Sequence, residues 1–318
     1  MKPEPSQYAK VLNIARLLLL PVTFGFIFYK LFYAYHFDDL VSKFHFIFSA
    51  KKILILGIVI LLMVLNWTVE SMKWRLLINK NEAMSFRGAL SAVLSGIALS
   101  IITPNQIGDF AGRIIHLKKF DKIKGSVVTV IGHTAQVIMT LAFGWFALVT
   151  FFTETKKIGP GHFPFFFFLF LIFAMLAVSG YLKIHVISRF FKTKKINTYL
   201  SVFSLYTSTE LSRVLFFALL RYTVFLAQYI LLLRFYDVHL SAVQYFSCIA
   251  SALFVQSFVP SFLLIDLGMR GATALYFFSA FTPDMVGVLL SAYSLWIINL
   301  MIPAFGGLIS ILKLNANR

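Results

Sequence analysis

Long runs of apolar residues, separated by short polar segments, make up most of the 318-residue chain. About 20 apolar residues in a helix cross the hydrocarbon core of a bilayer, which is about 30 Å thick. The runs that reach or approach this length cover residues 11–35, 53–68, 125–152, 163–182, 214–233 and 285–312. The pattern predicts an all-α polytopic membrane protein with about six to eight transmembrane helices, in which residues 1–318 form a single integral membrane domain. The first run is too long for a signal peptide and lacks a cleavage site, so we expect an anchor helix.

Two further apolar stretches are shorter and are interrupted. Residues 88–102 end just before Pro104, and a second short helix is predicted over 109–119. The other interrupted unit covers 242–281, around Pro260. Because lipid offers no hydrogen bonds to backbone groups, such breaks survive at membrane depth only where protein or a watery cavity covers them. We therefore predict two opposed re-entrant helical hairpins, over 88–119 and 242–281, in an inverted-repeat-like arrangement typical of transporters.

Both interruptions contain a proline, a glycine near an aspartate, and an arginine four residues after that aspartate. These residues are Pro104, Gly108, Asp109 and Arg113 in the first unit, and Pro260, Asp266, Gly268 and Arg270 in the second. A helix that starts inside the membrane directs unpaired N–H groups and the positive end of its dipole toward the break, and this end attracts anions. An arginine side chain also matches a phosphate group geometrically. The prolines and glycines are therefore predicted to break the helices, and the aspartates and arginines to bind a headgroup in a polar cavity between the hairpins.

Four more polar residues are candidates for the same cavity: Arg221, His133, Asn105 and Gln106. Ionisable groups at membrane depth are costly and are often functional. Structural interpretations remain open for each motif, because aspartate is a favoured N-cap and an Asp–Arg pair four residues apart stabilises its own helix. Arg221 also fits a polar bond to a neighbouring helix, and His133 and Gln136 fit hydrogen bonds between helices. Asn105 and Gln106 fit hydrogen bonding to backbone groups freed at the break.

The net charge of +17 accompanies a chain that is 59% hydrophobic and only 13% charged. Nucleic-acid-binding proteins carry a basic face on a soluble domain, and no such domain fits this chain, so nucleic acid is not an expected partner. With a cytoplasmic N-terminus and two re-entrant hairpins, roughly two thirds of the 29 Lys and Arg residues face the cytoplasm. This distribution predicts a protein of the cell (cytoplasmic or inner) membrane, with both termini cytoplasmic and the hairpins entering from opposite faces.

Three other segments have distinct compositions. Residues 183–212 combine basic and apolar residues at loosely helical spacing, which predicts interfacial amphipathic helices. The end of the second run resembles an aromatic and basic belt at the membrane interface, and it contains Asn66, Trp67, Glu70, Lys73, Trp74 and Arg75. The single cysteine, Cys248, permits no internal disulfide and fits an inert packing role.

At the two breaks the sequence resembles the transmembrane region of lysylphosphatidylglycerol synthases and its stand-alone flippase-like relatives. The resemblance extends from the KWRLL stretch at 73–77 to the C-terminus. It is carried by Pro104, Gly108, Asp109 and Arg113, and by residues 264–271. The chain departs from the family pattern at Gly271, where relatives often have a glutamate, at Ile265 and Asp266, where they have glycines, and at Gly132 and His133, where they often have an acidic residue and an arginine.

The resemblance implies a translocase for membrane lipids with an anionic or zwitterionic headgroup. In the synthases this region is joined to a soluble aminoacyl-transferring domain, for which 318 residues leave no room, so synthase activity is not expected. No cofactor or metal is expected, and an oligomer is compatible with the sequence. Two other classes stay open: a non-transporting membrane scaffold, and an enzyme acting on lipid or polyprenyl phosphates. The enzyme lacks support, because no carboxylate cluster or Ser/His pair lies at the breaks.

Overall fold

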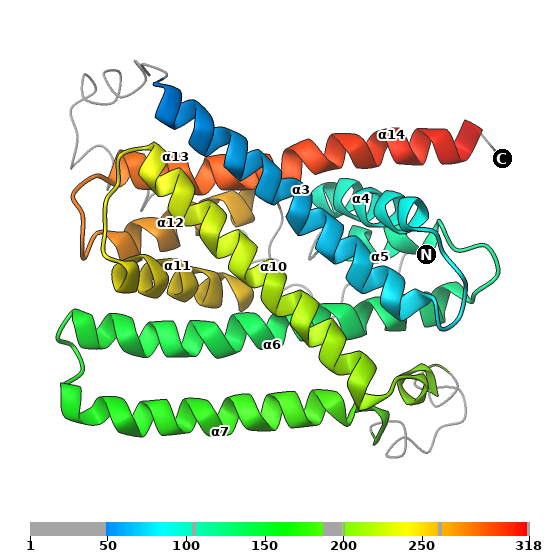
Figure 1. The fold of residues 1–318 in the computed structure, drawn as a ribbon, viewed down its shortest axis with the longest axis horizontal. Coiled ribbons are helices and arrows are strands. Elements are labelled where there is room, and N and C mark those ends of the chain that lie inside the picture. Colours follow the sequence, from blue (N-terminus) through cyan, green and yellow to red (C-terminus); the bar gives the residue numbers. More distant parts are fainter. Residues whose placement is uncertain (1–48, 104–105, 187–198, 200, 260–262, 317–318) are drawn as a thin grey trace, which may run out of the picture.

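The computed structural model describes residues 49–103, 106–186, 199, 201–259 and 263–316. Within them every regular element is a helix (Figure 1), which confirms the all-α prediction. Four single helices are long and apolar enough to span a membrane: α3 (Ala50–Ile78), α6 (Lys122–Glu154), α7 (Phe163–Leu182) and α10 (Ser208–Phe235). A fifth candidate span combines α13 (Met285–Trp296), the π-helical segment η5 (Ile297–Met301) and α14 (Ile302–Ala316). The chain is therefore a multi-pass membrane protein, and the predicted first helix at 11–35 lies outside the described residues.

Two helical hairpins occupy the interrupted units. The first joins α4 (Phe86–Ile102) to α5 (Ile107–Ile114), and the second joins α11 (Ala242–Ser257) to α12 (Leu263–Phe278). In Figure 1, α4 and α5 lie toward one end of the long axis and α11 and α12 toward the other, while α6 and α7 run along it. Pro104, Asn105 and Pro260 fall outside the described residues. The entry of the hairpins into a membrane from opposite faces remains a prediction.

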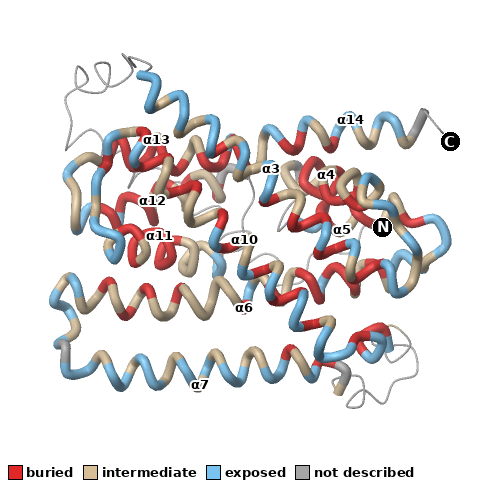
Figure 2. The backbone as a smooth tube through the Cα atoms, viewed as in Figure 1, coloured by how far each residue is buried: buried red, intermediate tan, exposed pale blue. Residues whose placement is uncertain are grey.

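The two largest buried apolar clusters of the described residues lie one in each half of the molecule. The cluster beside the first hairpin includes Trp74 and Leu211, and the cluster beside the second includes Phe151 and Leu232. Helices α3, α6 and α10 contribute to both clusters and so tie the halves together. In contrast, α7 is largely exposed (Figure 2), and only 6% of its most apolar 18-residue stretch is buried. Phe165 and Phe168 of its phenylalanine run face outward, as expected of a helix in contact with lipid, whereas Phe167 and Phe170 pack against Phe146 of α6.

The prediction that the residues after position 65 form a belt at the membrane interface is wrong. Asn66, Glu70, Lys73 and Trp74 are each 1–2% exposed, because α3 continues unbroken to Ile78 and packs against α4, α6 and α10. Asn66, Glu70 and Lys73 are spaced four and three residues apart and so share one face of the helix. Their partners come from other helices, which composition alone could not show. This polar face belongs to the interior of the protein.

The prediction of interfacial amphipathic helices over 183–212 is also partly wrong. Its described part contains two short 3₁₀ turns, η3 (Ile184–Val186) and η4 (Ser201–Leu205), and α10 already begins at Ser208. The Thr207 hydroxyl and the Glu210 carboxylate form a reciprocal capping box that fixes this start. Tyr206 is buried and its hydroxyl donates to the carbonyl of Leu77 at 2.9 Å. Val202, Phe203 and Tyr206 therefore pack against the protein core, while Leu205 stays exposed.

Three glycines bring the backbones of neighbouring helices against α4. A Cβ atom added at Gly108 would lie 2.1 Å from the Leu99 carbonyl oxygen, and one added at Gly112 would lie 2.4 Å from Ser95 backbone atoms. A Cβ at Gly307, in α14, would lie 2.0 Å from the Leu94 carbonyl oxygen. Because backbone atoms cannot move aside as flexible side chains do, only glycine fits at these positions.

We expect Gly112→Ala to destabilise the first hairpin by about 1–3 kcal/mol, the usual effect of overpacking a tight contact. Gly57→Ala is the matched control, because a Cβ at Gly57 has no atom within 4 Å. Apparent melting temperatures of the purified variants, measured by scanning fluorimetry, compare the two. Equal melting temperatures for Gly112→Ala and the wild type would contradict this packing.

The loop after the first hairpin is held by one carboxylate. Glu82 accepts hydrogen bonds at 2.9–3.2 Å from the backbone N–H groups of Lys118, Lys119 and Phe120. Partial burial raises the pKa of Glu82, but these hydrogen bonds outweigh it and hold the pKa below its ordinary value. The ionised side chain thus fastens the basic loop to the end of α3.

Glu82→Gln should lower stability by about 1 kcal/mol at neutral pH, because charge-assisted hydrogen bonds are replaced by weaker ones. A depressed folded-state pKa contributes stability above the unfolded-state pKa, and this contribution is lost as the pH falls through the folded-state value. The melting temperatures of wild type and variant should therefore converge on acidification. A constant difference across that pH range would show that the ionisation of Glu82 is not involved.

Candidate functional site

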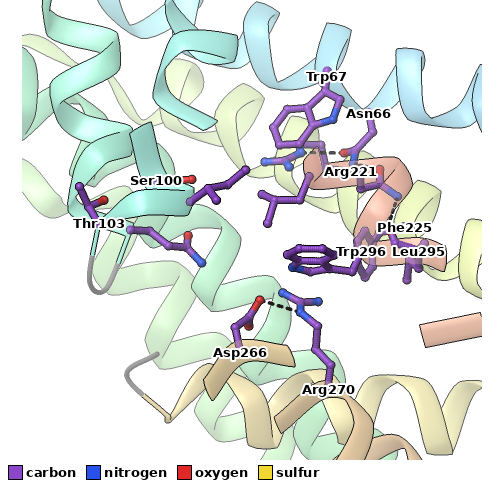
Figure 3. Close-up of a pocket in the computed structure, with 14 residues that line it drawn as sticks. Asn66, Trp67, Ser100, Thr103, Arg221, Phe225, Asp266, Arg270, Leu295 and Trp296 are labelled. Atoms are coloured by element: carbon purple, nitrogen blue, oxygen red, sulfur yellow. Dashed lines mark hydrogen bonds and ion pairs between the residues drawn. The ribbon is translucent and has the colours of Figure 1, made fainter. Parts of the chain in front are cut away.

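A polar cavity lies where the two hairpins meet the middle of α3, α10 and α13–η5 (Figure 3). Its inner chamber measures about 150 Å³, and a wider chamber beside it measures about 660 Å³. Both are lined by the same six residues: Asn66, Gln106, Arg221, Phe225, Asp266 and Arg270. The inner chamber adds the end of α4 and the two indoles Trp67 and Trp296, and the wider one adds residues of α6 and α11. The chambers are therefore two parts of one site.

The cavity lies halfway along the spanning helices. Arg221 is thirteen residues after Ser208 and fourteen before Phe235, the ends of α10. At about 1.5 Å per residue, its Cα is roughly 20 Å from either end of the helix. Asn299 lies within η5, a π-helical interruption at the middle of the last span. The polar groups are thus concentrated at the depth where a membrane would be most apolar.

The guanidinium group of Arg221 is fixed by several contacts, but not all of its N–H groups have a partner in the described part of the chain. Its Nε donates to Asn66 Oδ1 at 2.8 Å, and its Nη1 donates to Glu70 Oε2. The guanidinium also lies 5.0 Å from the centroid of the Trp67 ring, a cation–π contact. Among the described residues no hydrogen-bond partner is recorded for its Nη2, and 18% of the side chain is exposed. The remaining N–H groups of Arg221 are available at the cavity wall.

Arg270 is arranged in the same way on the opposite side in Figure 3. Its Nε donates to Asp266 Oδ2 at 2.8 Å, one turn earlier in α12. The two side chains are 22% and 19% exposed, and both line the two chambers. Within the described part of the chain, Asp266 is the only partner recorded for the Arg270 guanidinium. The second motif therefore forms its own helix-stabilising pair and still presents guanidinium N–H groups to the cavity.

The first motif is buried. Arg113 Nε lies 3.0 Å from the Asp109 carboxylate, and Asp109 Oδ2 lies 2.7 Å from His133 Nε2. Arg113 Nη1 lies 2.9 Å from Glu70 Oε1, and Glu70 Oε2 lies 2.6 Å from Lys73 Nζ. Neither Asp109 nor Arg113 lines the cavity. These side chains form a network behind the cavity wall, connected to it through Glu70 and Arg221.

The charges of this network do not cancel. Lys73, Arg113 and Arg221 face the carboxylates of Glu70 and Asp109, so one positive charge is in excess when His133 is neutral. Of the three cations, Arg221 is the most exposed, at 18% of its side chain against 2% for Lys73 and 5% for Arg113. The Asp266–Arg270 pair adds no net charge. The cavity therefore has an electrostatic preference for an anion.

Other predicted residues take different positions. Gln106 lines both chambers and adopts a left-handed backbone conformation, with φ 56°, at the start of α5. The Gly108 N–H donates a hydrogen bond to Thr103 Oγ1 at 2.7 Å, which closes the hairpin tip. Gly268 is buried within α12. His133 is 39% exposed and reaches Asp109, and it does not line the cavity.

Glu70 was missed as a site residue because its neighbours Trp67, Lys73 and Trp74 gave the segment the composition of an interfacial belt. Its carboxylate makes ion pairs with three basic side chains from three helices. The signal available in the sequence was the spacing of Asn66, Glu70 and Lys73, which places three polar groups on one face of an apolar helix. A polar stripe within a span indicates a protein-facing surface.

The family described as "Lysylphosphatidylglycerol synthase TM region" matches residues 13–301. The chain belongs to this family. The match covers both hairpins, every helix that lines the cavity and the buried network around Glu70, and it confirms the resemblance inferred from the two breaks. A search of curated proteins and a search of solved structures each gave no match.

Glu70→Ala should be strongly destabilising in this family member, because it leaves three buried or partly buried cations without their shared carboxylate. Breaking a buried ion pair by removing one partner costs about 3–5 kcal/mol. Lys73→Met should cost much less, since it removes the excess charge and leaves Arg113 and Arg221 paired. The yield of monodisperse protein and the melting temperature in detergent measure both variants. The opposite ranking, with Lys73→Met the more damaging, would show that Glu70 does not hold the network together.

Proposed function

We propose that this member of the lysylphosphatidylglycerol synthase transmembrane family translocates phospholipids that have an anionic or zwitterionic headgroup. The observation that carries the proposal is the pair Arg221 and Arg270, each held through Nε and each lining both chambers of one cavity. Guanidinium groups fixed in this way bind phosphate with little loss of side-chain freedom. A phosphate between them also compensates the excess positive charge of the buried network.

The wider chamber supports access by a lipid. Val137 of α6 and Phe258, just after α11, line this chamber and are 47% and 63% exposed. The chamber therefore reaches the outer surface between these two segments, at the middle of the spans. A lipid headgroup can occupy such a site while its acyl chains stay outside in the bilayer, which avoids moving the chains through protein.

The two hairpins support a transfer between leaflets. The end of α4 and the start of α12 line the same cavity, although their hairpins lie at opposite ends of the molecule (Figure 1). A site shared by two oppositely placed hairpins can be opened from either side by moving one hairpin at a time. In this scheme Asp109, Arg113 and His133 position Glu70 and Arg221 behind the wall, and the headgroup contacts Arg221, Arg270, Asp266 and Gln106. The orientation predicted from the basic loops places both termini in the cytoplasm.

Arg221→Gln and Arg270→Gln should each slow lipid transfer by about 10- to 100-fold, since each removes charge-assisted hydrogen bonds to the phosphate. Proteoliposomes with a fluorescent phosphatidylglycerol, quenched from outside, measure the transfer rate between leaflets. Arg213→Gln is the matched control, because Arg213 is an exposed arginine of the same helix. Wild-type transfer in both cavity variants would refute the proposal.

Release of inorganic phosphate from the lipid by purified protein would instead identify an enzyme.

A further inference from the structure

A second basic cavity lies at the end of the molecule where α3 begins and α10 ends. It measures about 610 Å³ and is lined by residues from both helices and from the loop before α11. The described residues that line this cleft are all different from those that line the central cavity. Arg234 is thirteen residues after Arg221 on α10, so the two sites are about 20 Å apart along the helix. The cleft is therefore a separate feature, placed at the level of the membrane surface if α10 spans the bilayer.

The charges of the cleft favour an anion. Among the described residues, its lining includes Lys51, Lys52, Arg234 and His239 together with a single acidic residue, Asp237. Asp237 is already paired with Lys52, at 2.7 Å. No carboxylate partner for Lys51 or Arg234 is recorded among the residues that the structure describes. The Arg234 guanidinium lies 5.8 Å from the centroid of the Tyr245 ring, which orients it over the cleft without neutralising it.

The other wall of the cleft is apolar. Leu54 and Leu231 line it one turn further into their helices than Lys51 and Arg234, and Leu54 is 64% exposed. A free phosphate ion would gain nothing from such a wall, whereas a phospholipid has both a phosphate and acyl chains. Basic side chains beside an apolar wall match the two parts of an anionic phospholipid, because they form charge-assisted hydrogen bonds to its phosphate while the wall contacts its chains. We infer that this cleft binds one anionic phospholipid, with its phosphate near Lys51 and Arg234 and its chains beside Leu54 and Leu231.

Native mass spectrometry of the full chain, titrated with dioleoyl phosphatidylglycerol or phosphatidylcholine, tests this site. The background variant is Arg221→Gln/Arg270→Gln, which removes the central arginines, so that failure of the translocase proposal cannot be confused with failure here. One phosphatidylglycerol should still bind to this background in preference to phosphatidylcholine. Adding Lys51→Gln and Arg234→Gln should weaken that binding about 30-fold, since each basic residue at a membrane surface contributes about a fivefold factor.

Two controls complete the test. Lys156→Gln/Lys157→Gln removes the same charge from an exposed loop that does not line the cleft, and should leave the affinity within about twofold of the background. Lys51→Gln alone, which removes a side chain that makes no ion pair with another described residue, should weaken binding about fivefold without affecting the melting temperature. Equal losses for the loop and cleft variants, equal binding of both lipids, or displacement of the lipid by millimolar inorganic phosphate would each overturn the inference.

Discussion

The structure depends on one buried carboxylate. Glu70 forms ion pairs with Lys73 of its own helix, Arg113 of the first hairpin and Arg221 of α10, and it is 2% exposed. Taking charges out of water is costly, and it is tolerated only where partners and hydrogen bonds compensate each charge. Glu70 therefore fixes the relative position of three helices, and through Arg221 it sets the charge at the cavity wall. Fold and candidate site share this interaction.

The two hairpins use the same residue spacing for different purposes. In α5 the arginine turns inward to Glu70, and in α12 the arginine lines the cavity. The difference arises from their neighbours: the side chains of α5 reach Glu70 of α3 and His133 of α6, whereas the start of α12 borders the open chambers. The two motifs therefore give one buried framework and one accessible surface.

Much of the fold follows from sequence alone. The apolar runs gave the long helices, and the interrupted stretches gave the two hairpins, because periodicity and length depend on local residues. Arg221 and Arg270 could also be selected from the sequence as candidates for the cavity, because each is a charged residue within an apolar stretch. The role of Glu70 did not follow, since its three partners lie 3, 43 and 151 residues away in sequence. The inward turn of Arg113 depends on the same long-range contacts, and the belt-like composition around Trp67 and Trp74 obscured them.

The glycine contacts of α4 have a mechanical consequence. Gly108 and Gly112 place the backbone of α5 against α4 at Leu99 and Ser95, one turn apart, and Gly307 places the backbone of α14 against α4 at Leu94. Interlocked backbones at this distance resist sliding and rotation, because even a small displacement produces steric overlap or loses the contact. We therefore expect the three helices to move as one rigid body. Any movement of the first hairpin would then carry the C-terminal helix α14 with it. A spectroscopic label on α14 would therefore report the movement of α4 and α5, which lie far from it in sequence.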